Sequence, residues 1–336
     1  MNRILAITSV ILLVLVLIPA ITSAADEESV GGTFETNNTP GITVSLYTTD
    51  TLLPTSAMNP LTEYDARVSV TDSDGITDLG SIEVKIWYDG DGGSASESDF
   101  DGIAAGNTQT AVIITWTESS NTFSIDPSAS TTWSLGAGSV APVDLTGEFH
   151  FKFTVGKAAT ITSGAARWQI AARVIDDTPQ TAWAADAEGA TMAWYGEISG
   201  VSGTVSWGQV NPGMNFAEGA PSEQALGGTP VKYISNGPYD EKVRSSATWT
   251  SGSTTVTLVA SETLTANQFA LRADDTSTLA SAVLVDDAGV AIDVNAAQTG
   301  ESGEDVGTNT LWLKLASTFA KGDYTGTITY IIAQRT

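Results

Sequence analysis

Glu148–Val155 reads Glu-Phe-His-Phe-Lys-Phe-Thr-Val, in which polar and apolar side chains alternate strictly. Successive side chains of a β-strand point to opposite faces, so Phe149, Phe151 and Phe153 are predicted to share one buried face. The same alternation recurs along the chain between turns rich in Gly, Asp and Ser, whereas helical periodicity is scarce. Segments of this length and spacing predict an all-β protein built from antiparallel β-sandwiches.

The expected strands fall into two sets. In the first half they are Ile42–Thr48, Glu63–Thr71, Ser81–Tyr88, Gln109–Trp116, Glu148–Val155, Ala166–Ile175 and Ala190–Gly196. In the second half they are Gly203–Trp207, Pro230–Ser235, Lys242–Thr250, Thr255–Val259, Gln268–Arg272, Ala282–Val285, Thr310–Leu315 and Tyr324–Ala333. We expect two tandem Ig-like sandwich domains, at 41–197 and 198–336, after a flexible N-terminal arm at 26–40.

The first 25 residues have the three parts of a secretory signal peptide. A basic start at Arg3 is followed by an apolar run from Ile4 to Ile18 and by small residues that end at Ala24 and Ala25. The apolar run is shorter than the roughly 20 residues that a membrane helix needs. We therefore expect a secreted or cell-surface protein with no membrane span after cleavage of residues 1–25. An uncleaved N-terminal anchor is the alternative.

The amino-acid composition restricts the classes of partner that the chain is expected to bind. The chain has 39 Asp and Glu against 14 Lys and Arg, for a formal net charge of −25. Such a charge repels nucleic acid and favours cations and basic partners. We expect no nucleic-acid partner, and self-association or contact with other cell-surface proteins instead, with glycans as further candidates. Because the chain has no cysteine, stability is expected to come from core size, metal ions or assembly.

Several segments resemble the largely uncharacterised secreted Ig-like surface proteins of archaea, especially those of methanogens and their relatives. They include Met58-Asn59-Pro60, Val68-Ser69-Val70-Thr71-Asp72-Ser73-Asp74-Gly75, Trp194-Tyr195-Gly196-Glu197-Ile198, Tyr233-Ile234-Ser235-Asn236-Gly237 and Tyr324-Thr325-Gly326-Thr327-Ile328-Thr329-Tyr330. The resemblance implies the sandwich fold and a surface location. That family has no agreed activity, so it implies no catalytic residue.

Aspartates gather around the Ser81–Tyr88 strand and form the strongest candidate metal site. Calcium takes six to eight oxygen ligands, and Asp-x-Asp loops with glycine supply several of them on a tight curve. The candidate ligands are Asp72, Asp74, Asp78, Asp89, Asp91, Asp99 and Asp101. The spacing lacks the bidentate glutamate of an EF-hand loop. The alternative is that Asp and Gly are present here as ordinary turn residues.

Catalytic constellations are weak in this sequence. His150 is the sole histidine and lies on the strand face opposite the phenylalanines, so we expect it on the solvent side. A Ser-His-Asp triad would have to use it, and no sequence motif singles out a pair of glycosidase carboxylates. With one histidine and no cysteine, the usual zinc ligands are missing.

Nine tryptophans raise the alternative of a carbohydrate-binding surface. Large aromatic side chains in strands usually fill cores, as we expect for Trp87, Trp168, Trp207, Trp249 and Trp312. Trp133, Trp183 and Trp194 fall near strand ends and are the better candidates for exposed, sugar-binding rings.

Tyr324–Ala333 has high β-propensity and no charge before Arg335. Such a strand is either paired on both sides or leaves an edge open to another subunit. We expect an interior strand, with strand exchange by residues 26–40 as a minority alternative. The sequence as a whole favours a non-enzymatic structural subunit or accessory of a surface layer, sheath or extracellular filament, with calcium as candidate stabiliser. A secreted adhesion or carbohydrate-binding module is the alternative, and a secreted hydrolase the third.

Overall fold

The computed structural model describes residues 38–335, except 50, 52, 74, 76–77, 105–107, 127–131, 138–145, 178–179, 202–203, 218–224 and 303. The expected signal peptide, most of the expected arm and Asp74 therefore lie outside the described residues. Residues 38–336 cluster as one compact unit. Within it the chain is almost entirely strand, which confirms the all-β prediction.

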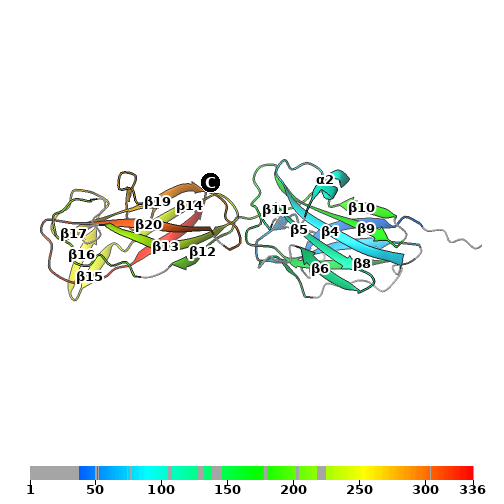
Figure 1. Cartoon of the computed structure of the whole chain (residues 1–336), viewed down its shortest axis with the longest axis horizontal. Helices are drawn as coiled ribbons and strands as arrows, with labels where there is room; N and C mark the ends of the chain where they lie inside the picture. The colour runs from blue at the N-terminus through cyan, green and yellow to red at the C-terminus, as the bar shows by residue number, and fades with distance from the viewer. Residues whose placement is uncertain are drawn as a thin grey trace, which may run out of the picture. The chain divides into compact units, whose positions relative to one another are not determined.

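Two sheets enclose the first core (Figure 1). One has the order β1 (Gly41–Thr48), β3 (Glu63–Thr71), β8 (Thr146–Thr154), β7 (Ser134–Leu135). The other has the order β10 (Thr181–Ala185), β9 (Arg167–Asp176), β4 (Leu79–Asp89), β5 (Ala111–Thr117), β6 (Thr122–Asp126). Both are antiparallel, and β2 (Ala57–Met58) and β11 (Thr191–Met192) add a short parallel pair.

The second core lies between a larger sheet and a three-stranded one. The larger sheet has the order β12 (Gly196–Val201), β13 (Ala225–Ser235), β20 (Glu304–Leu315), β17 (Gln268–Asp274), β16 (Thr254–Leu258), β15 (Thr248–Ser251), with β18 (Val283–Leu284) beside β17. The smaller sheet has the order β19 (Val290–Ala296), β14 (Tyr239–Ser245), β21 (Ile328–Gln334).

Alternation identified the inward faces correctly. Phe149, Phe151 and Phe153 are fully buried, and the inward residues of β3 and β4 lie in the same core. Local deviations arise where packing overrides the pattern. Thr204–Trp207 forms no strand, although Trp207 packs into the second core. The expected strand Lys242–Thr250 is divided into β14 and β15, which belong to different sheets.

One short helix, α2 (Glu97–Gly102), packs on the outer face of the β10-to-β6 sheet and was not predicted. Its Phe100 ring is held between Lys85 Nζ at 4.6 Å and Arg173 Cζ at 4.7 Å. Lys85 Nζ also donates to the Phe100 carbonyl, at 3.0 Å. Within the described residues, no helix has the length and apolar character needed to cross a membrane.

The position of the last strand, β21 (Ile328–Gln334), differs from the interior position that the sequence predicted. β21 pairs only with β14 among the described strands, so it lies at the edge of the three-stranded sheet. The preference for an interior strand was therefore wrong. Alternation specifies which face of a strand is buried, but it carries no information about the order of strands in a sheet.

Candidate functional site

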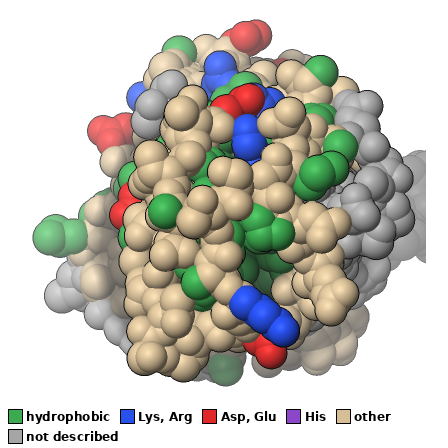
Figure 2. All heavy atoms as spheres, turned by 90° about the vertical axis from the view of Figure 1, so that its left-hand side faces the viewer, with side chains coloured by type: hydrophobic (Ala, Val, Ile, Leu, Met, Phe, Trp, Pro, Cys, Tyr) green, Lys and Arg blue, Asp and Glu red, His purple; other side chains and the backbone are tan. Residues whose placement is uncertain are grey.

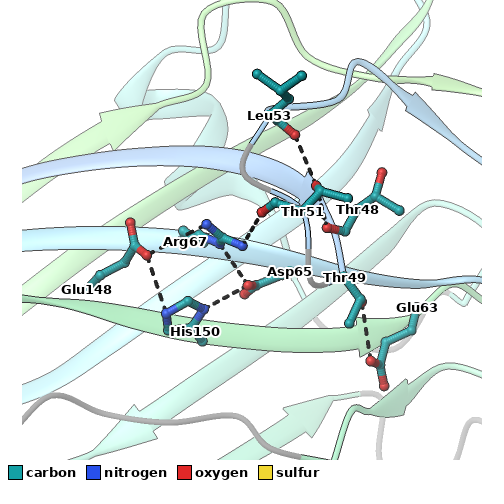
Figure 3. Close-up of polar contacts among 9 residues, drawn as sticks. All are labelled: Thr48, Thr49, Thr51, Leu53, Glu63, Asp65, Arg67, Glu148 and His150. Atoms are coloured by element: carbon teal, nitrogen blue, oxygen red, sulfur yellow. Dashed lines mark hydrogen bonds and ion pairs between the residues drawn. The ribbon is translucent and has the colours of Figure 1, made fainter.

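A polar cluster lies on the outer face of β3 and β8 (Figure 3). The register between these strands sets Arg67 opposite His150, with Asp65 two residues before Arg67 on the same face. Asp65 Oδ2 accepts from Arg67 Nε at 2.9 Å and lies 2.7 Å from His150 Nδ1. The Asp65 side chain is only 1% exposed, so these two neighbours are its main electrostatic support.

Arg67 also holds the chain that follows β1. Its Nη2 donates to the Thr51 carbonyl at 2.6 Å, and its guanidinium lies over the Tyr47 ring, 4.0 Å from the centroid. A planar guanidinium suits this combination of stacking and directed hydrogen bonds better than a lysine ammonium does. Through Arg67, the cluster therefore binds the segment that follows β1 to the sheet.

His150 does not have the geometry of a catalytic histidine. Its Nδ1 faces Asp65, but its Nε2, where a serine nucleophile would have to lie, is 3.3 Å from Glu148 Oε1. Both ring nitrogens are thus next to carboxylates. The side chain is 25% exposed, on the face opposite the phenylalanines, as expected from alternation.

We expect Asp65→Ala to lower the free energy of unfolding by about 3 kcal/mol, because it removes one partner of a buried ion pair. Glu148→Ala is the matched control, since Glu148 also contacts His150 but is 41% exposed. Its loss should cost less than about 1 kcal/mol. Urea unfolding of both variants measures the difference, and equal losses would contradict a central role for Asp65.

Several of the candidate calcium ligands have protein partners. Asp89 accepts from the Asp91 amide at 3.0 Å, Asp99 caps α2 through Ser96, and Asp101 pairs with Arg173 at 2.6 Å. Asp72 is buried after β3, and Asp78 lies just before β4. In the described part of the chain, no three acidic or histidine side chains form a group suited to a metal ion. Asp74 lies outside that part, so calcium binding here stays a prediction.

The three tryptophans predicted to lie at the surface are less exposed than expected. Trp133 is 2% exposed and stacks on Phe153 in the first core, so its assignment to the surface was wrong. Trp183 and Trp194 are half-buried. Trp87, Trp168, Trp207 and Trp312 are buried as expected, while Trp249 is partly buried against the second core.

Figure 2 shows the surface at the β15–β17 side of the chain. Hydrophobic side chains lie near the centre of this surface, and most of the rest of it is uncharged.

Polar contacts between segments of the first and second cores centre on Asn236, which follows β13 and is fully buried. Its Nδ2 donates to the carbonyls of Ala159 at 2.9 Å and Ala193 at 2.8 Å. Its Oδ1 accepts from the Tyr195 amide at 2.7 Å. The Ile161 amide donates to the Asn236 carbonyl at 2.9 Å. Every hydrogen-bonding group of this amide side chain is therefore used.

Further contacts join segments of the two cores. Gln109 Nε2 donates to the Thr299 carbonyl at 2.8 Å, and Gln298 Nε2 donates to the Ala158 carbonyl at 2.8 Å. At the start of β12, Glu197 accepts from the Tyr195 hydroxyl at 2.7 Å. Burial and the neighbouring Glu197 raise the pKa of Tyr195 to about 12, and this hydrogen bond lowers the pKa of Glu197. Glu197 is therefore ionised at neutral pH, where it pairs with Lys157 at 3.3 Å.

Sequence reasoning missed both the ionic cluster and these contacts. Glu63–Thr71 does alternate charged and apolar residues, so Asp65 and Arg67 were assignable to an outer face. Their partner His150 lies more than eighty residues away, and no local pattern gives that pairing. In Tyr233-Ile234-Ser235-Asn236-Gly237, the asparagine followed by glycine indicates a turn, and this is the sequence signal that points to Asn236.

No family model and no curated protein match this chain. Among solved structures, the chain is similar to the major pilin subunit BcpA of Bacillus cereus, at 10% identity and a TM-score of 0.23. The match covers 87% of this chain and 59% of the pilin, so the chain spans less than two thirds of its length. A variant of the same pilin matches at 11% identity and a TM-score of 0.24, over 87% of this chain and 67% of that one. Likenesses this distant transfer no function.

Proposed function

We propose that this chain is a non-enzymatic structural subunit of an extracellular assembly at the cell surface, such as a layer, sheath or filament. The observation that carries the proposal is the buried hydrogen-bond network around Asn236. Domains in one chain move relative to each other by default unless their interface is extensive. A fully satisfied buried network opposes such motion, and a fixed relation between domains is what a filament-forming or lattice-forming subunit requires.

Export and surface location are part of the same proposal, and they rest on the signal-peptide pattern of residues 1–25. The chain's charge of −25 is compatible with assembly where cations or salt screen the repulsion between copies.

Light scattering of the wild-type chain over a wide range of concentration, with and without millimolar calcium, tests this function. We expect the mean mass of the particles to rise with protein concentration to that of oligomers or larger assemblies. A mass that stays at one chain in all conditions would contradict it. In that case a glycan panel read by tryptophan fluorescence would test the adhesion alternative.

Calcium as a stabiliser belongs to this proposal and has its own test. If the turns around Asp72–Asp101 bind calcium in the folded state only, saturating calcium should raise the melting temperature by about 5 °C relative to chelator. Magnesium is the matched control, because it demands a smaller octahedral site. A melting curve indifferent to calcium would rule out this role.

A further inference from the structure

β21 (Ile328–Gln334) is a described edge strand with neither a charged side chain nor a register shift against its neighbour. Native sheets protect their edges with short strands, charges, bulges or covering segments. β21 has seven residues, no charged side chain, and an unbroken register with β14. β12 lies nearby in the facing sheet but forms no ladder with β21.

The other described edges are protected. On β1, the Leu46 amide donates to Asp186 and the Leu46 carbonyl accepts from Thr55, at 3.1 and 2.9 Å. β12 and β19 have register shifts against their neighbours. Thr250 of β15 exchanges two hydrogen bonds with Thr325, both 3.0 Å. β6 and β10 have five residues each, and β7 has two.

The hydrogen bonds at both ends of β21 show which backbone groups face outward. The Arg335 amide donates to the Pro238 carbonyl, and the Ser246 amide donates to the Thr327 carbonyl. Backbone groups of an antiparallel strand alternate between its two sides, so odd-numbered residues of β21 face β14. Ile328 and Ile332 therefore turn their N–H and C=O groups toward the open side.

We propose that β21 pairs with β21 of a second copy of this chain, antiparallel and centred on Ile331. This inference rests on the proposed structural function and names the surface that would serve it. A two-fold axis makes a strand pair with itself in antiparallel orientation. In a chain with a net charge of −25, an uncharged edge is where two copies can approach without direct repulsion. Ile331 is the midpoint of the strand, so this register uses its full length.

The outward face also suits the pairing. Tyr330 packs in the second core, with Ile328 and Ile332 partly buried against it, so Ile331 lies on the opposite face. Its Cδ1 lies beside Gly289. Centred pairing sets Ile331 next to Ile331 of the second copy, as an apolar cross-strand pair. It also sets Thr329 opposite Ala333 of the second copy.

Single cysteines test the register directly, because the chain has none of its own. Directly opposed residues of antiparallel strands have Cβ atoms close enough for a disulfide. Under mild oxidation of the full chain, Ile331→Cys should give disulfide-linked dimer. Only Ile331→Cys places the two thiols of a pair opposite each other, where their effective concentration is high. Thr329→Cys alone and Ala333→Cys alone should therefore give on the order of tenfold less disulfide-linked dimer. An equal mixture of the last two variants should restore cross-linking.

Equal cross-linking by all three single variants, or none by Ile331→Cys, would overturn the pairing. If wild-type chains then still gain mass in light scattering, the structural function stands and another surface mediates it. If scattering also shows only single chains, both proposals fall. As a second readout, Ile331→Glu sets like charges opposite each other and should reduce association. Val294→Glu, at a 60% exposed valine on β19, should not.

Discussion

Asn236→Ala is expected to lower the free energy of unfolding by about 3 kcal/mol or more, since each buried backbone group left unpaired costs roughly 1–3 kcal/mol. The groups affected are the carbonyls of Ala159 and Ala193 and the amide of Tyr195. Alanine cannot replace any of these contacts, and the fully buried site gives water poor access. Scanning calorimetry and urea unfolding measure the loss.

The matched control for this variant is Asn211→Ala, at an exposed asparagine. Its effect should stay within about 0.5 kcal/mol, as for most surface substitutions. In calorimetry, Asn236→Ala should also broaden or divide the unfolding transition, because it removes contacts between segments of the two cores. If Asn236→Ala and Asn211→Ala were equally stable, the Asn236 network would not couple the two cores.

Trp133→Ala is expected to cost about 3–5 kcal/mol, the usual loss when a large aromatic side chain is removed from a core. The Trp133 ring stacks on Phe153 at 6.2 Å and lies 5.9 Å from the Trp168 ring, and its Nε1 donates to the Thr108 carbonyl at 2.7 Å. A surface tryptophan that binds sugar would show almost no loss of stability. This variant therefore separates the structural role from the surface role that the sequence had indicated.

Trp183→Ala is the matched control, because Trp183 is half-buried beside α2. Removing part of its buried apolar area should cost about 1–2 kcal/mol. If Trp133→Ala proved no more destabilising than Trp183→Ala, the packing of Trp133 described above would be incorrect. Thermal and urea unfolding with unchanged far-UV circular dichroism at low temperature give the comparison.

The sequence predicted what depends on local periodicity. The alternation at Phe149–Phe153 identified a strand, its buried face and the outward position of His150. It did not give the partners of His150, because the pairing of β3 with β8 joins segments far apart in sequence. Trp133 was misassigned because it lies outside any alternating run, between β6 and β7. Only the three-dimensional packing shows that this segment carries its ring inward.

The edge position of β21 and the presence of α2 have a similar explanation. Composition showed that Tyr324–Ala333 favours a strand, but sheet order depends on long-range packing that composition does not encode. The helix α2 is too short for helical periodicity to be visible. Its capping box, in which Ser96 and Asp99 cap each other's backbone amides, was the available signal.

Negative-stain electron microscopy of the concentrated wild-type chain tests the proposed function most directly. We expect particles larger than one chain, in the form of filaments, sheets or discrete oligomers, that are lost on dilution. A field of uniform single chains at every concentration, with and without calcium, would contradict the structural role.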